Sequence, residues 1–167
     1  KRQPFVEDMA TSFEYEVPSV NEFQKRIVET LEKFPYLVAL YEGEVAGYAY
    51  AGSFRSRCAY GWSVESSVYV SPIFHRRGIG KSLYLRLLGF LRAQGAVNVF
   101  AGITLPNEGS VRLHESLGFK KIGVYKNVGY KHNKWWDVGW WQLGLQMPNR
   151  PVDLKSYSEI AQVGTIS

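Results

Sequence analysis

A glycine-bearing turn between a strand pattern and a helix pattern constrains this chain more than any other feature. The run Val68-Tyr69-Val70 is β-branched and aromatic, Ser71-Pro72 ends it, and Gly78 and Gly80 open a helical pattern. Unhindered backbone N–H groups and the positive end of a helix dipole together form a site for phosphate oxygens. The turn therefore predicts a phosphate-bearing ligand at this helix start.

Two nucleotide-binding motifs fail at this turn. A P-loop needs a glycine five residues before Gly80-Lys81-Ser82, where the chain has His75. A dinucleotide fingerprint needs glycine or alanine three residues after Gly80, where the chain has Leu83. The turn is therefore expected to bind neither a nucleoside triphosphate nor a dinucleotide.

The other patterns alternate between helix and strand within one mixed α/β domain. Helical spacing of apolar residues predicts helices over 19–34, 80–94 and 109–117, and extended runs predict strands over 36–41, 45–51, 63–70, 97–104, 120–130 and 136–146. A length of 167 residues with 46% hydrophobic residues suits a single core. We expect one domain over 1–147, with helices covering a sheet. The proline-bearing tail over 148–167 is expected to wrap the surface or to be mobile.

Charge and composition narrow the possible partners. The segment 75–134 holds 11 Lys and Arg against two acids. This excess predicts either a solvated basic face or an anionic partner: nucleic acid, an anionic membrane or a phosphorylated small molecule. No helix-turn-helix, zinc or RNP pattern supports nucleic acid, and no apolar run approaches about 18 residues, so no membrane span is expected. One cysteine and three scattered histidines predict neither an internal disulfide nor a metal site. No signal-peptide pattern follows Lys1, so a cytoplasmic location is expected.

Two segments together resemble the acetyl-CoA-binding parts of the GNAT-superfamily N-acetyltransferases. The loop 75–80 has the spacing of their pyrophosphate loop, with His75 in place of the usual Gln or Arg, and Asn107 precedes a short helix ending in Gly118-Phe119. The resemblance implies a GNAT fold, a mostly antiparallel sheet in which two parallel strands splay around the cofactor's pantetheine chain. It implies that acetyl-CoA contacts Val68, Tyr69, Val70, Arg76, Arg77, Gly78, Ile79, Gly80, Lys81, Asn107 and Ser110.

Within this superfamily the chain resembles the phosphinothricin N-acetyltransferases and their amino-acid-acetylating relatives. The matching segments are 13–14, 43–47, 49–52, 64–71, 110–118, 129–132 and 136–139. The resemblance implies a homodimeric enzyme that moves acetyl directly to the α-amino group of a small anionic substrate such as phosphinothricin, methionine sulfoximine or methionine sulfone. The family's first strand and most of its first helix have no counterpart before Pro4, so we expect them to be absent.

The same resemblance assigns catalytic roles to Glu65 and His114. Glu65 matches the family's general base, and no other carboxylate lies between Glu44 and Glu108 to raise its pKa by repulsion. His114 stands where many superfamily members carry a tyrosine, and an imidazole with a pKa of about 6.5 can act as acid or base. A strand-edge glutamate paired with an arginine and a structural histidine remain the alternatives.

Substrate recognition is expected over 54–62. Arg55, Arg57 and Tyr60 match substrate-contacting positions of the branch, and two arginines two apart in an extended stretch would present both guanidiniums on one face. The alternatives are a plain polar loop, an acetyltransferase for another amine such as a peptide N-terminus or a polyamine, and a non-enzymatic nucleic-acid-binding module. Arginines, where a polyamine would need acids, argue against the polyamine.

Overall fold

The computed structural model describes residues 18–161, and the elements there follow the predicted order. They are α2 (Val20–Lys33), β1 (Tyr36–Tyr41), β2 (Glu44–Ser53), η1 (Cys58–Tyr60), β3 (Ser63–Val70), η2 (Pro72–Phe74), α3 (Ile79–Gln94), β4 (Asn98–Leu105), α4 (Glu108–Ser116), β5 (Lys120–Lys131), β6 (Lys134–Gly144) and α5 (Tyr157–Ala161). The expected absence of a first strand and helix, and the resemblance at 13–14, concern residues outside this range. Across 18–161, no helix is both long and apolar enough to cross a bilayer.

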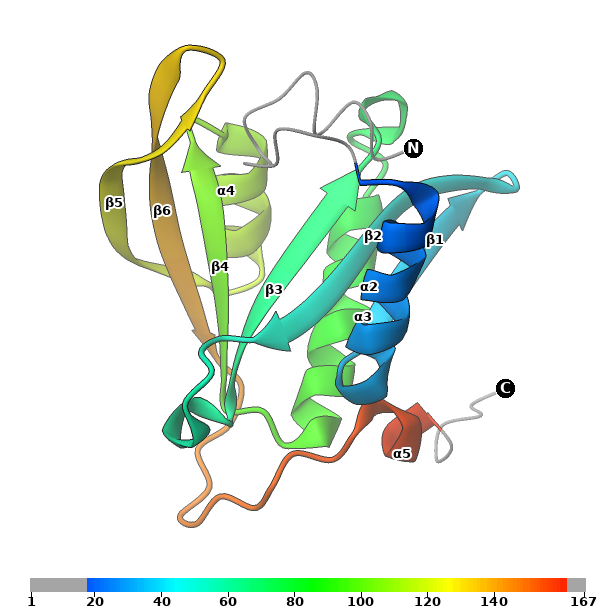
Figure 1. Ribbon diagram of the computed structural model, residues 1–167, viewed down its shortest axis with the longest axis vertical. Coiled ribbons are helices and arrows are strands. Elements are labelled where there is room, and N and C mark those ends of the chain that lie inside the picture. The colour runs from blue at the N-terminus through cyan, green and yellow to red at the C-terminus, as the bar shows by residue number, and fades with distance from the viewer. Residues whose placement is uncertain (1–17, 162–167) are drawn as a thin grey trace.

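The sheet confirms the predicted mixture of antiparallel and parallel pairing. Its six strands lie in the order β1-β2-β3-β4-β6-β5, and only the central β3–β4 pair is parallel. That pair joins through three residue pairs, from Ser63↔Asn98 to Glu65↔Phe100. Beyond Glu65 the two strands diverge as a V, which Figure 1 shows at the centre of the molecule. The predicted GNAT fold with splayed parallel strands is therefore present.

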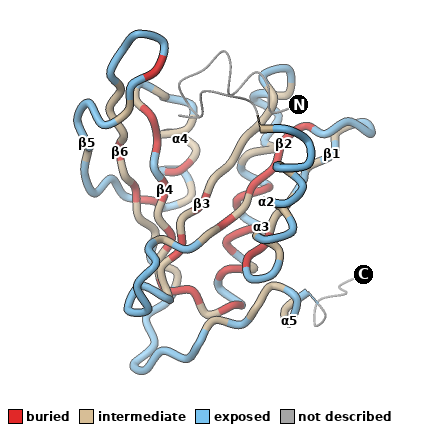
Figure 2. Tube along the Cα trace, in the orientation of Figure 1, coloured by how far each residue is buried: buried red, intermediate tan, exposed pale blue. Residues whose placement is uncertain are grey.

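Helices cover both faces of the sheet, α2 on one and α3 with α4 on the other (Figure 1). Along β3 the side chains alternate: Ser66 meets Tyr84 of α3, whereas Tyr69 meets Tyr48 of β2, whose ring contacts Phe23 of α2. The core lies mainly between α3 and the sheet, and Figure 2 shows buried segments on β2, β4 and α3. It includes the α3 side chains of Leu83, Leu87 and Leu91.

Local sequence signals set the ends of both long helices. The hydroxyl of Ser19 accepts the backbone N–H of Glu22 while the carboxylate of Glu22 accepts the backbone N–H of Ser19, which completes the predicted capping box at the start of α2. The α3 helix ends at Gly95, whose φ of 98° lies in the left-handed region that favours glycine. These two signals explain why the helix boundaries were predictable within a residue or two.

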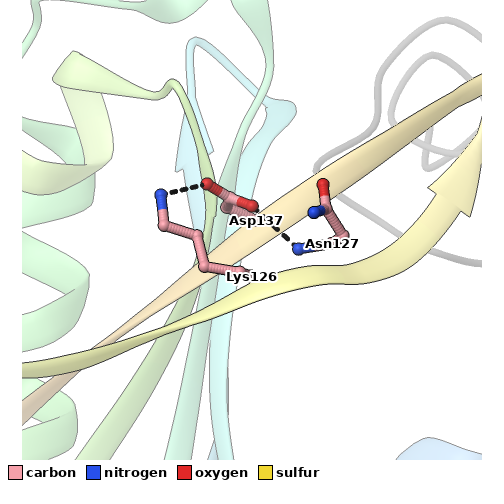
Figure 3. Close-up of polar contacts among 3 residues, drawn as sticks. All are labelled: Lys126, Asn127 and Asp137. Carbon is pink, nitrogen blue, oxygen red and sulfur yellow. Dashed lines mark hydrogen bonds and ion pairs between the residues drawn. The ribbon is translucent and has the colours of Figure 1, made fainter.

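A bulge in β5 is organised by one carboxylate of β6. Between Tyr125↔Val138 and Gly129↔Trp136, three residues of β5 lie opposite Asp137 alone. Asp137 accepts the backbone N–H of Asn127 at 2.8 Å and the ammonium of Lys126 at 2.7 Å (Figure 3). Asn127 has a φ of 49°, so the carboxylate compensates a backbone shape that non-glycine residues rarely adopt. These two contacts lower the pKa of Asp137.

Replacing Asp137 with Ala is expected to lower the melting temperature more than replacing Lys126 with Ala. The first change removes the acceptor of a backbone N–H in a strained turn, whereas the second removes only an ion pair whose ammonium is largely exposed. Parallel thermal melts of D137A and K126A at neutral pH test this order. Equal melting temperatures for the two variants would contradict it.

The C-terminal tail is fastened to the ends of two helices. The buried side chain of Gln94 donates to the carbonyls of Lys33 and Lys155, and the backbone N–H of Lys155 donates to the carbonyl of Gln94. Earlier in the tail, the carbonyl of Val152 accepts the indole N–H of Trp62 at 2.6 Å. The described part of the tail thus lies against the surface, and the boundary at residue 147 stays a prediction.

Candidate active site

Glu65 lies where β3 and β4 separate. It is the last residue of β3 in the ladder with β4, opposite Phe100, and its side chain is half-buried. Burial raises the pKa of Glu65, and the positive charge of Arg55 partly offsets that rise. Like-charged neighbours along the chain predict no rise in this pKa, whereas desolvation, which depends on the fold, has the larger effect on it. A carboxylate with a raised pKa is a stronger proton acceptor once ionised.

His114 is buried and held through both ring nitrogens. Its Nδ1 lies 2.7 Å from the backbone carbonyl of Ser110, and its Nε2 lies 2.7 Å from the hydroxyl of Tyr84. Because a carbonyl only accepts, Nδ1 carries the proton and Nε2 accepts from Tyr84. Burial lowers the pKa of His114, although the Ser110 carbonyl acts in the opposite direction. The imidazole is therefore neutral at neutral pH, with its lone pair directed at the tyrosine.

Tyr84 is the site residue that sequence reasoning missed. Its hydroxyl lies 3.0 Å from that of Ser66 on β3, so a buried chain of polar groups runs from β3 through α3 to α4. Burial raises the pKa of Tyr84 far above its usual value, and the charge of Glu65 acts in the same direction. A tyrosine between Leu83 and Leu87, on the inner face of a helix pattern, was the signal that could have revealed it.

The predicted phosphate turn has an open helix start. Gly78 is the N-cap of α3 with a φ of 74°, and no side chain hydrogen-bonds at this cap. His75 contacts the carbonyl of Val70 at 3.0 Å, and Arg77 donates to the hydroxyl of Tyr41 at 2.8 Å. The guanidinium of Arg77 also lies over the ring of Tyr41, so Arg77 is engaged with β1.

The other residues predicted to contact acetyl-CoA lie around the V of the sheet. Arg76 and Lys81 are exposed beside the helix start, together with Ile79 and Gly80 in the first turn of α3. Val68 and Val70 follow Glu65 along the diverging half of β3, and the ring of Tyr69 stacks toward Tyr48 on the α2 side. The predicted residues of this strand and turn are thus continuous in space.

A shallow depression lies where β4 ends and α4 begins. It has a volume of about 440 Å³ and is lined by Leu105, Pro106, Asn107, Glu108, Val111 and Arg112. Asn107 caps α4 by accepting the backbone N–H of Ser110 at 3.0 Å, and the hydroxyl of Ser110 lies 3.3 Å from Nδ1 of His114. The cap residues and His114 therefore form one unit.

The loop over 54–62 differs from the extended stretch that the sequence predicted. It consists of bends followed by the short η1 turn, so a spacing of two does not place Arg55 and Arg57 on one face. The guanidinium of Arg55 lies 4.2 Å from the centre of the Phe54 ring, and Tyr60 meets that ring edge-on. Arg57 and Tyr60 are exposed. Stacking on Phe54, rather than strand alternation, directs Arg55.

Comparison with known proteins places this architecture. The family model for the acetyltransferase (GNAT) domain matches residues 2–140. The chain belongs to the GNAT acetyltransferases. Because it belongs to this family, the protein is an acyltransferase. Residues 18–161 hold no group of three His, Cys, Asp or Glu side chains suited to a metal ion.

Individual relatives place this GNAT protein on the phosphinothricin branch. It is 42% identical to the phosphinothricin N-acetyltransferase of Streptomyces viridochromogenes, over 93% of this chain and 85% of that one. It is 40% identical to the L-methionine sulfoximine/L-methionine sulfone acetyltransferase of Salmonella typhimurium, over 67% and 66%. A GNAT phosphinothricin acetyltransferase from Sinorhizobium meliloti, solved with acetyl-CoA, superposes with a TM-score of 0.82 at 38% identity, covering 89% of this chain and 82% of that one.

Proposed function

We propose that this GNAT protein transfers acetyl from acetyl-CoA to the α-amino group of a small anionic amino-acid-like substrate of the phosphinothricin, methionine sulfoximine or methionine sulfone type. The observation that carries the proposal is Glu65, a half-buried carboxylate at the divergence of β3 and β4 with the positive charge of Arg55 acting on it. A base beside a guanidinium suits a substrate that bears both an amine and an acid. The names of the Streptomyces and Salmonella relatives support the same substrate class.

The helix start of α3 suits the donor's pyrophosphate. Gly78 leaves the backbone N–H groups of Ile79, Gly80 and Lys81 without a capping side chain, and an uncapped helix N-terminus favours anions. Exposed Arg76 and Lys81 add positive charge there, while Arg77 holds the loop to Tyr41. In this proposal the diverging half of β3, with Val68, Tyr69 and Val70, flanks the pantetheine chain, and Asn107 and Ser110 contact the cofactor from α4. Bound acetyl-CoA supplies the reactive thioester.

The chain's own residues then divide the proton transfers. Glu65 accepts the proton of the substrate ammonium, directly or through water, so that the amine becomes a nucleophile. As the N–C bond forms and the C–S bond breaks, the second proton lost by the amine passes to the departing thiolate, which leaves as the free thiol. The hydroxyl of Tyr84 stays protonated and is directed by the Nε2 lone pair of His114. His114 therefore acts through Tyr84, whose hydroxyl its unprotonated Nε2 accepts. Arg55, with Arg57 and Tyr60 on the same loop, binds the acidic group of the substrate.

A thiol-release assay with acetyl-CoA tests the proposal. Phosphinothricin, methionine sulfoximine, methionine sulfone, methionine, dipeptides and spermidine are compared, and mass spectrometry locates the added acetyl group. We expect N-acetylated products from the first three acceptors with the highest kcat/KM. Thiol release with dipeptides or spermidine alone would replace the proposed acceptor class, and release with none would overturn the enzymatic proposal. The expected homodimer and cytoplasmic location stay predictions.

A further inference from the structure

The ring of Phe54 has a neighbour on each of its sides. The guanidinium of Arg55 lies 4.2 Å from its centre, and the ring of Phe100 stacks with it at 4.2 Å and 19°. Trp140 of β6 meets the same ring edge-on at 6.3 Å, and Tyr60 does so at 6.1 Å. Phe54 therefore links an exposed arginine to two strands on the far side of the V.

Phe100 connects this stack to the proposed base. It is the ladder partner of Glu65, so the ring that supports Phe54 belongs to the residue directly opposite the carboxylate. Arg55 also donates from Nη1 to the carbonyl of Phe54 at 3.0 Å, which fixes the guanidinium to the same residue a second time. A long, exposed arginine side chain otherwise samples many rotamers, and restricting it lowers the entropy lost on binding an acid.

We propose that Phe54 is a positioning residue for acceptor recognition: its ring, fixed against Phe100, holds the guanidinium of Arg55 beside Glu65, where it binds the anionic group of the acceptor. The inference rests on the proposed function, because it assigns Arg55 to the acceptor. It goes beyond that function by giving Phe54 and Phe100 a role that is neither proton transfer nor substrate contact. Rings and a guanidinium at these distances attract one another by a cation–π interaction.

The first test replaces Phe54 with Leu, which removes the ring and keeps an apolar side chain. The KM for methionine sulfone is expected to rise about three- to tenfold, with kcat and the KM for acetyl-CoA unchanged. The acidic limb of the kcat/KM profile is expected to move to higher pH. The charged group that lowers the pKa of Glu65 is Arg55, while Tyr84 from α3 is neutral over this range, so displacing the guanidinium raises that pKa.

Matched variants separate positioning from general stability. Phe54→Trp keeps a stacking face and is expected to restore the acceptor KM. Phe90→Leu removes a ring of α3 that contacts Tyr157 of α5, away from the V. This variant is expected to leave the acceptor KM and the acidic limb of the kcat/KM profile unchanged. Combining Phe54→Leu with Arg55→Ala is expected to add nothing to Arg55→Ala alone. The inference would be overturned by additive effects of the two substitutions on the acceptor KM. It would also be overturned if Phe54→Leu left both the acceptor KM and the acidic limb of the kcat/KM profile unchanged.

Two measurements keep the inference testable apart from turnover and from folding of the leucine variant. A carbon-13 NMR titration of the Glu65 carboxyl is expected to show a higher pKa in Phe54→Leu than in the wild type, with no substrate present. Arg55→Lys, a change at an exposed position, keeps the charge but weakens stacking and is expected to raise the acceptor KM. A wild type that acetylates no acceptor would refute the proposed function, whereas an unchanged Glu65 titration would refute this inference alone.

Discussion

Replacing Glu65 with Gln is expected to lower kcat/KM at least about 100-fold, because the amide cannot accept the proton of the substrate ammonium. The loss should fall on turnover, since Glu65 lies on β3 at the strand divergence, whereas the proposed donor site begins further along β3 at Val68 and continues to the helix start at Gly78. Thiol release with methionine sulfone measures the loss, and titration with acetyl-CoA in the absence of acceptor is the control. Near-wild-type turnover with intact acetyl-CoA binding would remove Glu65 from the mechanism.

The stability of the same variant provides an independent check. Burial raises the pKa of Glu65 in the folded protein, so the unfolded chain holds fewer protons near that pKa and the ionised carboxylate opposes folding as pH rises through it. Below about pH 4.5 the group is protonated in both states and this penalty disappears. E65Q is therefore expected to melt no lower than the wild type at pH 7. A clearly lower melting temperature would instead indicate a structural ion pair.

Replacing His114 with Ala is expected to cost about 100-fold or more in turnover and also to destabilise the fold. The hydroxyl of Tyr84 would lose its 2.7 Å acceptor inside the core and keep only Ser66 as a partner, and losing one such hydrogen bond costs about 0.5–1.5 kcal/mol. Tyr84→Phe separates the two effects, because it removes the hydroxyl and leaves the histidine in place. If His114 acts through Tyr84, the double variant is no slower than the slower single one. Independent, multiplying losses would show that His114 acts directly.

The pH dependence of folding reports on the same histidine. Since burial lowers the pKa of His114 in the folded state, the unfolded chain takes up its proton first. The stability that the neutral His114 contributes to the fold is fully present above about pH 6.5. It is lost as the pH falls from there through the lower pKa of the folded state. Urea titrations of wild type and His114→Ala between pH 7.5 and 5 should show a steeper loss in the wild type.

Features of this fold that depend on neighbouring residues in the chain were predictable. Each of these signals involves only residues close together in the sequence: the pairing of Ser19 with Glu22, the stop at Ser71-Pro72 and the left-handed Gly95. The structure has each element whose end they mark. The strand β6 is shifted by two residues from its predicted range, because the tight turn at Asn133 admits Lys134 to the ladder. Strand ends of this kind depend on the partner strand.

The properties that depend on contacts between distant segments were not predictable. The raised pKa of Glu65 comes from burial, and the chain Ser66–Tyr84–His114 joins three elements that no local pattern connects. The sequence predicts an extended stretch over 54–62 with Arg55 and Arg57 on one face, whereas the loop is bent and the ring of Phe54 stacks on Phe100. Resemblance supplied Glu65 and His114, but only the fold supplied Tyr84.

The V between β3 and β4 has an evolutionary consequence. The loop over 54–60 and the turn over 75–81 lie at opposite ends of β3, so substitutions in one need not disturb the other. Under the proposed function, a descendant of this chain can exchange the acidic group that it prefers by altering a few loop positions, while the helix start with Gly78 is inherited unchanged. The three residue pairs that end at Glu65 are the common inheritance on which both depend. Sequence variation among descendants should therefore be greatest before Ser63 and should decrease along β3.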